Sequence, residues 1–213
     1  MNNLTAQGRR QERRQRHHEL SRAQLLDAAE EVFGRKGFHD TTLREIAELA
    51  EFSVGSVYSF FQSKDDLFRS IFSRRGEQFM DAMRAVLDLD GDPARQIHEL
   101  VDMQVGFFRS HPHFGRLYLR YATSAGVSEE RLADTSVAAN YDESMALQAV
   151  LFARGQAAGI FRDGDPVVLA RLFSGLMSAY QAVDPAVVAD PPATERLKLA
   201  ALHEIVTGAF APR

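Results

Sequence analysis

The stretch SVGSVYSFFQSK, residues 53–64, gathers side chains that suit contact with a polyanion better than they suit a hydrophobic core. Gly55 lacks a Cβ, so another molecule can approach its backbone closely. Ser56 can donate or accept a hydrogen bond, Tyr58 ends in a hydroxyl on a rigid arm, and Lys64 supplies a positive charge. Backbone amides at the start of a helix also attract phosphate. The stretch therefore favours a short helix that meets phosphates or base edges.

Each of these residues also has a purely structural explanation. Gly55 could mark a close contact between helices, and Tyr58 could pack half-buried. Ser53 and Thr42 could serve only as helix caps. The interpretation as a binding surface depends on their joint placement around a helix that is too polar to be core.

The elements that must position these residues are helices, because apolar residues recur at helical spacing along most of the chain and strand signals are nearly absent. The pattern predicts an all-α fold of about nine helices. Capping boxes mark several starts, with Ser21 and Gln24, Thr42 and Glu45, and Ser63 and Asp66 three residues apart. The predicted helices cover residues 21–36, two short segments after Thr42 and Ser53, a segment after Ser63, and about 94–110, 112–123, 129–158, 166–182 and 194–210.

Two short helices joined by a tight turn, with a third behind them, predict a helix-turn-helix. In that geometry the second short helix enters the major groove of DNA. Thr42, at the cap of the first short helix, can reach a phosphate from the other side. We divide the chain into a basic flexible tail (1–20), a helix-turn-helix DNA-binding domain (21–67) and a helical body (68–213).

Composition and charge agree with this division. The chain has 213 residues, ample for a core, and its net charge is −4. Residues 1–75 carry 13 Lys/Arg against 11 Asp/Glu, whereas the remainder carries a net −6, so only the N-terminal end favours phosphate. A chain without cysteine fits a cytoplasmic protein. No apolar run approaches the length of a membrane helix, and no secretory signal is visible.

Residues 22–68 resemble the DNA-binding region of the TetR family of bacterial transcription regulators, without a gap. The matching features are LLDAAEEVF, GF followed by TT, REIAELA, SVGSVYSFF and SKDDLF. The resemblance implies an all-α homodimer with a three-helix DNA-binding domain and a divergent body that dimerises and holds a small-molecule pocket. Carried over residue by residue, it implies DNA contacts at Thr42, Ser53, Val54, Gly55, Ser56, Tyr58 and Lys64.

Two positions depart from the family pattern. Members usually have glycine in the turn where this chain has Glu51, and a non-glycine residue in the left-handed conformation costs about 1 kcal/mol. Members often have histidine where this chain has Phe60, whose ring cannot donate to a phosphate. We expect Phe60 to contact a thymine methyl or a sugar, or to pack inward.

The body holds more aromatic and methionine side chains than one helix face needs. Ligand sites are mostly apolar with a few polar groups, so some of these residues could line a pocket, although most could equally be core or dimer seam. The predicted pocket residues are Met103, Phe107, His111, Tyr118, Met145 and Met177, with His111 or a tyrosine hydroxyl as the polar group.

The last two predicted helices are rich in small and aliphatic residues, which suits a two-fold interface, although a monomer core would look similar. The predicted dimer residues are Leu172, Gly175, Leu176, Ala179, Leu197, Ala201 and Ile205. A dimer would present its two recognition helices about 34–36 Å apart to a palindromic operator.

These features predict a sequence-specific DNA-binding transcriptional regulator, a repressor released from its operator by a small apolar or amphipathic ligand. The alternative is a helical ligand-binding or interaction protein that does not bind DNA. An enzyme is not expected, because no nucleophile–base pair stands out. No metal or cofactor is expected either: His203-Glu204 lacks the second histidine of a zinc-protease helix, since Thr207 stands there. Asp88, Asp90 and Glu99 fail as a calcium loop because Pro93 occupies the glycine position.

Overall fold

The computed structural model describes residues 2–88, 90–123, 126–127 and 136–212, and the side chains of 8–88, 90–121 and 137–212. The fold is all-α, as the sequence predicts, apart from an antiparallel pair of two-residue strands, β1 (Ala122–Thr123) and β2 (Gly126–Val127). The chain forms two compact units, which we call the N-terminal unit (residues 1–71) and the C-terminal unit (residues 72–213).

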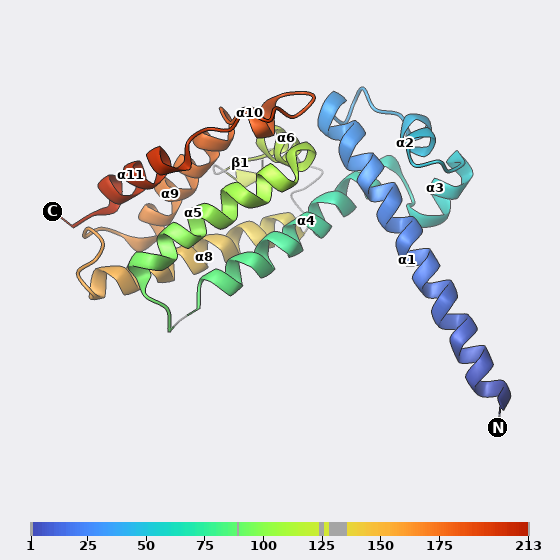
Figure 1. The fold of residues 1–213 in the computed structure, drawn as a ribbon, viewed down its shortest axis with the longest axis horizontal. Helices are drawn as coiled ribbons and strands as arrows, with labels where there is room; N and C mark the ends of the chain where they lie inside the picture. Colours follow the sequence, from blue (N-terminus) through green and yellow to red (C-terminus); the bar gives the residue numbers. More distant parts are fainter. Residues whose placement is uncertain (1, 89, 124–125, 128–135, 213) are drawn as a thin grey trace. The chain divides into compact units, whose positions relative to one another are not determined.

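The N-terminal unit contains the helix-turn-helix (Figure 1). Its helices are α1 (Asn2–Lys36), α2 (Leu43–Leu49), α3 (Val54–Phe60) and the first turns of α4 (Lys64–Val86). Phe33 of α1 lies at the centre of the core, with its ring 5.3 Å from Phe68 and 5.8 Å from Phe38. Val57 and Phe61 are buried and anchor α3 to this core. The apolar stripes of the sequence therefore fix which face of α3 remains exposed.

Helix α1 is much longer than the sequence predicts. It begins at Asn2, where the prediction has a flexible tail up to residue 20 and a helix start at Ser21. Ser21 lies inside the helix, so it is not an N-cap, and the predicted capping box with Gln24 is wrong. The segment before Ser21 is rich in Arg, Gln and Glu, has no proline, and thus favours helix by propensity alone.

The other predicted caps of the N-terminal unit are confirmed. Thr42 and Glu45 form a reciprocal capping box at the start of α2. The Ser53 hydroxyl accepts from the amide of Ser56 at 3.0 Å, and the Ser63 hydroxyl accepts from the amide of Asp66 at 3.0 Å. These bonds satisfy amide donors that a helix start leaves unpaired. They also fix where α2, α3 and α4 begin.

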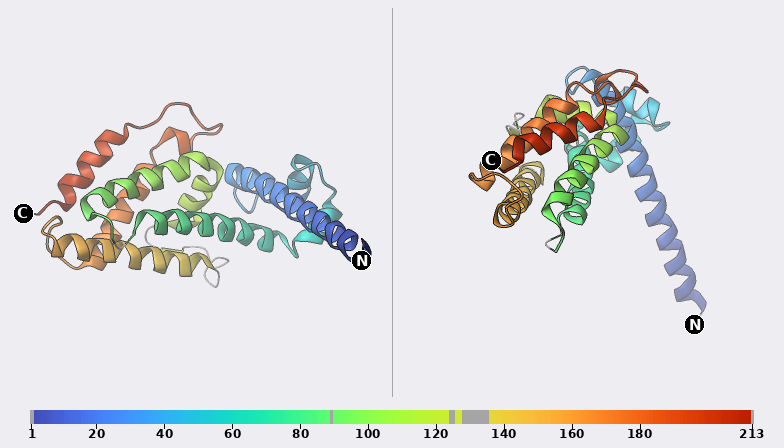
Figure 2. Two further views of the ribbon diagram at one scale, coloured as in Figure 1. Left: turned by 60° about the horizontal axis from the view of Figure 1, so that its bottom comes forward. Right: turned by 60° about the vertical axis from the view of Figure 1, so that its left-hand side comes forward.

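The C-terminal unit is a helical bundle. Besides the rest of α4 it contains α5 (Pro93–Ser110), α6 (Pro112–Tyr121), α8 (Ser136–Ala157), α9 (Pro166–Gln181), α10 (Pro185–Val188) and α11 (Leu199–Phe210). Helices α5, α8 and α9 contact one another, and α11 packs on α5 and α9 (Figure 2). Both DGDP sequences begin helices as expected, because Asp92 and Asp165 accept from amides of α5 and α9.

The structure differs from the sequence prediction at the end of the chain. The described residues form ten helices, one more than expected, because the short α10 lies where a loop was predicted. Helix α11 begins at Leu199, about one turn later than predicted. The predicted start of the 129–158 helix lies outside the described residues. None of the helices within the described ranges is long and apolar enough to cross a membrane.

A buried ion pair organises the chain around α10. Arg109 Nε donates to Asp184 Oδ2 at 2.7 Å, and the Asp184 side chain is only 1% exposed. The same guanidinium donates to the Leu197 carbonyl at 2.8 Å and to the Tyr180 hydroxyl at 3.1 Å. The other Asp184 oxygen accepts from the Ala186 amide at 3.2 Å. One arginine and one aspartate therefore hold the segment between α9 and α11.

Candidate functional site

Helix α3 presents a polar face to solvent and an apolar face to the core of the N-terminal unit. Val57 is fully buried, whereas Tyr58 is 58% and Val54 is 37% exposed. Ser53 and Gly55 are exposed, and Ser56 is half-exposed. This is the arrangement of a recognition helix, in which the side chains opposite the core are free to enter a groove. The structure thus brings the predicted residues of α3 together on one surface.

No contact among the described residues requires glycine at position 55. A Cβ built there meets only Ser53 Oγ, at 3.8 Å, which is an ordinary contact. Gly55 also does not adopt a positive φ. A helical glycine costs up to about 1 kcal/mol relative to alanine. Packing among the described residues therefore does not explain why position 55 holds glycine.

Thr42 is engaged in the capping box that begins α2. Its hydroxyl and its amide both contact Glu45 Oε2, at 3.0 and 2.9 Å. Hydrogen bonds from Lys36 and from Thr42 lower the pKa of Glu45 to about 2. Thr42 itself is exposed. Its predicted phosphate contact would therefore be made by a residue that also holds the start of α2.

Lys64 and Phe60 have partners within the N-terminal unit. The Lys64 ammonium lies 4.5 Å from the centre of the Phe38 ring and 3.4 Å from the His39 carbonyl oxygen. The Phe60 ring lies 4.7 Å from the ring of His18, on α1, and 6.5 Å from that of Phe52. Phe60 is half-buried between α1 and the turn before α3, so both alternatives expected for it stay open.

Glu51 occupies the left-handed conformation that the sequence suggested for the turn between α2 and α3. Its φ is 61°, and it is the one residue other than glycine with a positive φ in the part of the chain that the structure describes. The turn keeps its shape, because the Phe52 amide donates to the Ala47 carbonyl at 2.8 Å. The helix-turn-helix is therefore formed at some cost in backbone strain.

The N-terminal part of α1 gives this unit a basic surface. Residues 8–20 are exposed throughout. Arg9, Arg13 and Arg16 are spaced three or four residues apart and border one shallow surface depression together with Glu12. Arginines on one helix face are suited to phosphate contacts. The predicted basic tail is thus presented as a helix.

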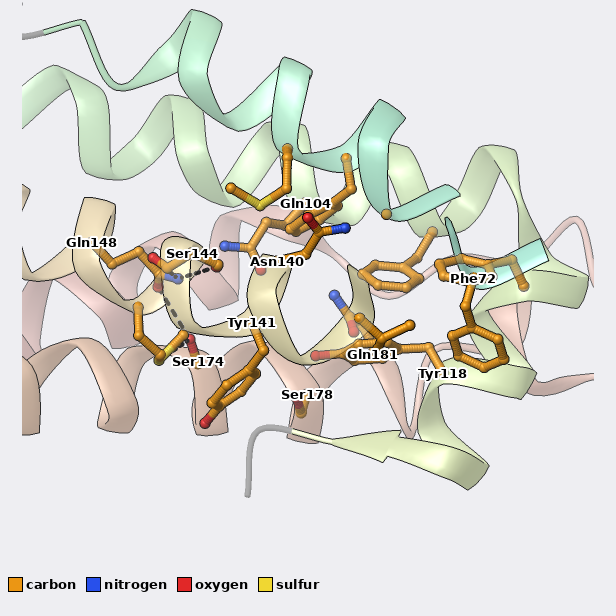
Figure 3. Close-up of a pocket in the computed structure, with 17 residues that line it drawn as sticks. Phe72, Gln104, Tyr118, Asn140, Tyr141, Ser144, Gln148, Ser174, Ser178 and Gln181 are labelled. Carbon is orange, nitrogen blue, oxygen red and sulfur yellow. Dashed lines mark hydrogen bonds between the residues drawn. The ribbon is translucent and has the colours of Figure 1, made fainter. Parts of the chain in front are cut away.

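A cavity lies within the C-terminal unit, enclosed by α4, α5, α6, α8 and α9 (Figure 3). It offers about 80 Å³ to the centres of water-sized molecules, and one water needs roughly 10–15 Å³ on this measure. Its walls are mainly apolar, with Phe72, Phe79 and Phe108 among them. The cavity is thus large enough for a small organic molecule.

The polar side chains of the cavity are amides and hydroxyls. The described residues that line it include no Lys, Arg, Asp, Glu or His. At one end of the cavity these groups form hydrogen bonds with one another. Gln148 Nε2 donates to Ser144 Oγ at 2.9 Å, and Ser174 Oγ donates to Gln148 Oε1 at 3.1 Å (Figure 3). Burial raises the pKa of Tyr118 to about 12, so its hydroxyl stays protonated.

The structure places only part of the predicted pocket set at the cavity. Tyr118 and Met145 line it, whereas Met103, Phe107, His111 and Met177 are not among its lining residues. Met177 is buried in the core, and Met103 packs against that core. His111 caps the end of α5, with Nδ1 at 2.9 Å from the Phe107 carbonyl oxygen, so it is not the polar group of the cavity. Helical periodicity identifies buried positions but does not show which of them face a void.

The amide side chains of the cavity were not predicted from the sequence. Gln104, Asn140 and Gln181 line it, and none of them was in the predicted set. One signal was available: Gln104 and Gln181 lie at apolar positions of their helices, where a buried polar side chain needs a partner. Aromatic and methionine side chains do not carry this signal, which belongs to buried amides.

The predicted dimer residues divide by burial. Leu172 is 60% exposed and Ile205 is 54% exposed, and Ala179 and Ala201 are also exposed. Gly175, Leu176 and Leu197 are partly buried. Val168 of α9 is 51% exposed, and Val183, which follows the end of α9, is 62% exposed. Contiguous exposed apolar side chains of this kind are typical of an interaction surface.

Fold and site together define an all-α protein with an N-terminal helix-turn-helix and a helical unit that encloses a small-molecule cavity. Residues 25–71 match the family described as "Bacterial regulatory proteins, tetR family". The repressor NicS of Pseudomonas putida is 29% identical over 144 residues, which span 67% of this chain and 66% of NicS. A TetR-like regulator from Rhodococcus sp. RHA1 superimposes with a TM-score of 0.69 at 25% identity, covering 88% of this chain and 92% of that one.

The regulator AibR, solved with isovaleryl coenzyme A and operator DNA, has a TM-score of 0.71 at 16% identity, covering 89% of this chain and 97% of its own. At that identity the likeness concerns the fold alone. The match to the tetR family covers residues 25–71, which hold the helix-turn-helix of this chain.

Proposed function

We propose that this protein is a sequence-specific DNA-binding transcriptional regulator, a repressor that leaves a palindromic operator when a small ligand binds. The observation that carries the proposal is α3, whose exposed face holds Ser53, Val54, Gly55, Ser56 and Tyr58. A glycine that no intramolecular contact requires, on a helix anchored by Val57, suits close approach to a DNA backbone.

The working form is a homodimer. The exposed apolar face of α9 and α11, which includes Leu172 and Ile205, is the proposed interface. A two-fold axis would present two copies of α3 to the two half-sites of an operator, about 34–36 Å apart. Each half-site alone binds weakly, so dimerisation supplies much of the operator affinity.

Ligand binding would be coupled to DNA binding through α4. This helix is unbroken from Lys64 to Val86 and contributes Phe72, Gly76, Phe79 and Met80 to the cavity wall. A ligand that favours one position of these side chains therefore acts on a helix whose first turns belong to the N-terminal unit. A coupling free energy of about 1–3 kcal/mol changes DNA affinity roughly 5–150-fold.

The regulator acts by binding and is not expected to catalyse a reaction. The relatives named above are regulators, and the cavity holds neutral amides and hydroxyls in place of a nucleophile with an adjacent base. We place the protein in the cytoplasm, where its DNA would be.

The first experiment is fluorescence anisotropy of the protein on duplexes from its own upstream region, over a salt series, with scrambled duplexes for comparison. Specific binding that weakens as salt rises is the expected result. Tyr58→Phe should weaken operator binding about tenfold or more, because a hydrogen bond to a charged phosphate is lost. Tyr121→Phe, in the C-terminal unit, is the matched control and should bind like the wild type.

Lys64→Ala provides a second, electrostatic readout. Loss of one phosphate contact should reduce the slope of log affinity against log salt by about 1, whereas Tyr58→Phe should leave the slope unchanged. Absence of binding to every genomic segment at low salt would contradict the proposal. The chain would then be a helical ligand-binding or interaction protein.

A further inference from the structure

Two amide nitrogens at the cavity lack hydrogen-bond partners. Gln104 Nε2, on α5, and Asn140 Nδ2, on α8, are fully buried atoms with no partner among the residues that the structure describes. The Gln104 side chain is 6% exposed. Both residues line the cavity, where Figure 3 shows them between the Gln148–Ser144–Ser174 end and the Tyr118–Gln181 end. Buried donors are nearly always paired, so two unpaired donors at one cavity need an explanation.

Gly76 makes room for one of these amides. A Cβ at position 76 would lie 2.5 Å from Asn140 Nδ2, so any other residue would displace that amide from its place. Gly76 belongs to the interior of α4, where glycine is otherwise unfavourable. The α4 sequence and the Asn140 amide therefore fit each other, although Asn140 makes no hydrogen bond through this nitrogen within the described chain.

The cavity also limits the charge of an occupant. The described lining residues include no Lys, Arg, Asp, Glu or His, and burial keeps the Tyr118 hydroxyl protonated by raising its pKa to about 12. A carboxylate or an ammonium group in such a site would lose its hydration without a counter-charge. A neutral acceptor, in contrast, loses little on burial and gains a hydrogen bond from each amide.

We propose that Gln104 and Asn140 form a donor pair, in which each unpaired amide nitrogen offers a hydrogen bond to an acceptor, such as a carbonyl oxygen, of a small uncharged ligand. The remaining atoms of the ligand contact the aromatic wall. This inference rests on the proposed function, since it names the ligand class to which the regulator responds. On the measure used above, the cavity volume is about 80 Å³, and one water-sized group needs roughly 10–15 Å³. The cavity therefore has room for about five to eight non-hydrogen atoms. A cyclic ketone of this size fits both the wall and the donors.

The first test uses the unliganded protein and needs no ligand. Replacing an unpaired buried donor by an apolar side chain of similar shape removes a penalty. Gln104→Met and Asn140→Leu should therefore keep or raise the thermal midpoint. The matched control is Gln96→Met, also in α5, because the Gln96 amide is 1% exposed and donates to the carbonyls of Val86 and Asp88. Its midpoint should fall. A clear fall for Gln104→Met would overturn the proposal.

The second test compares cyclohexanone with methylenecyclohexane, which has the same shape but no acceptor. NMR titration of the full-length wild type should show about tenfold tighter binding of cyclohexanone. Cyclohexanecarboxylate and cyclohexylammonium should bind more weakly than the ketone. In the double variant Gln104→Met/Asn140→Leu the preference for the ketone should fall to about one, while methylenecyclohexane still binds.

Three results would each reject the donor pair. The two neutral probes could bind the wild type equally well, a charged probe could bind more tightly than the ketone, or neither neutral probe could bind. Operator anisotropy on the same samples separates this inference from the proposed function. Operator binding without a ketone preference rejects only the donor pair. A ketone preference without operator binding rejects only the regulator and leaves the ligand site.

Discussion

Gly55 and Glu51 lie four residues apart, and each differs from the residue that stability alone would favour. Position 55 has room for a side chain but holds glycine, whereas position 51 has the positive φ that favours glycine but holds glutamate. Both residues belong to the helix-turn-helix. Substitutions at position 51 therefore test the backbone strain of the fold, whereas substitutions at position 55 test the proposed contact with DNA.

Gly55→Ala should raise stability and weaken operator binding. Alanine is favoured in a helix by up to about 1 kcal/mol, so the free energy of unfolding should stay equal or increase. Operator affinity should fall about tenfold or more, because a methyl group would separate α3 from the DNA. Gly106→Ala is the matched control, since Gly106 is an exposed helical glycine of α5 with nothing within 4 Å of a built Cβ. Unchanged operator affinity for Gly55→Ala would show that the backbone does not approach DNA there.

Glu51→Gly should stabilise the protein by about 1 kcal/mol, because glycine adopts a positive φ without the penalty paid by other residues. Urea denaturation followed by circular dichroism measures the change. Glu48→Gly, three residues earlier inside α2, should instead destabilise by a similar amount. Destabilisation by both substitutions would mean that the Glu51 side chain makes a contact worth more than its strain.

At the scale of the elements, caps made the short helices predictable. The motifs at Thr42, Ser53, Asp92 and Asp165 all begin helices in the structure. The two predictions that were wrong, the start of α1 and the loop in place of α10, both concern segments in which no apolar periodicity is visible. Before Ser21 no apolar stripe marks the helix, because residues 8–20 of α1 are exposed and contribute no buried side chain to the core. Helix α10 is only four residues long, too short for periodicity to reveal.

The capping box of α2 predicts a pH dependence of stability. Lys36 and Thr42 hold the pKa of Glu45 at about 2, below its ordinary 4.5. Because the folded pKa is the lower one, the stabilisation is complete above about pH 4.5 and is lost as the pH falls toward 2. The difference in unfolding free energy between wild type and Glu45→Gln should therefore shrink across this range. Glu48→Gln is the control, because Glu48 pairs with Arg44 in an exposed salt bridge of the same helix. A difference that stays constant would exclude the linkage.

At the scale of the whole molecule, the sequence predicted the all-α fold and the recognition helix more closely than it predicted the cavity. The helix-turn-helix is local, so its residues lie near one another in the sequence. The cavity is assembled from five helices spread between Phe72 and Gln181. Which side chains meet there depends on how those helices pack, and no spacing within one helix contains that information.

The proposed dimer can be tested by placing charge on its surface. Leu172→Arg or Ile205→Arg should convert a dimer into a monomer in sedimentation velocity and weaken operator binding, because a buried unpaired charge opposes association. Val150→Arg, on α8, is the control, since Val150 is 43% exposed and lies outside the predicted interface. Dimers that persist in both interface variants would assign the contact to another surface.

The ion pair between Arg109 and Asp184 ties together three parts of the chain that no shared helix joins. The Ala186 amide and the Leu197 amide both donate to Asp184 Oδ1, at 3.2 and 3.5 Å. Their protection against hydrogen exchange then depends on one carboxylate, so the two amides should exchange through a single opening event with the same free energy. Arg109→Met, which leaves that carboxylate buried without its counter-charge, should accelerate both by the same factor. The segment between α9 and α11 would thus behave as one cooperative unit although most of it is not helical.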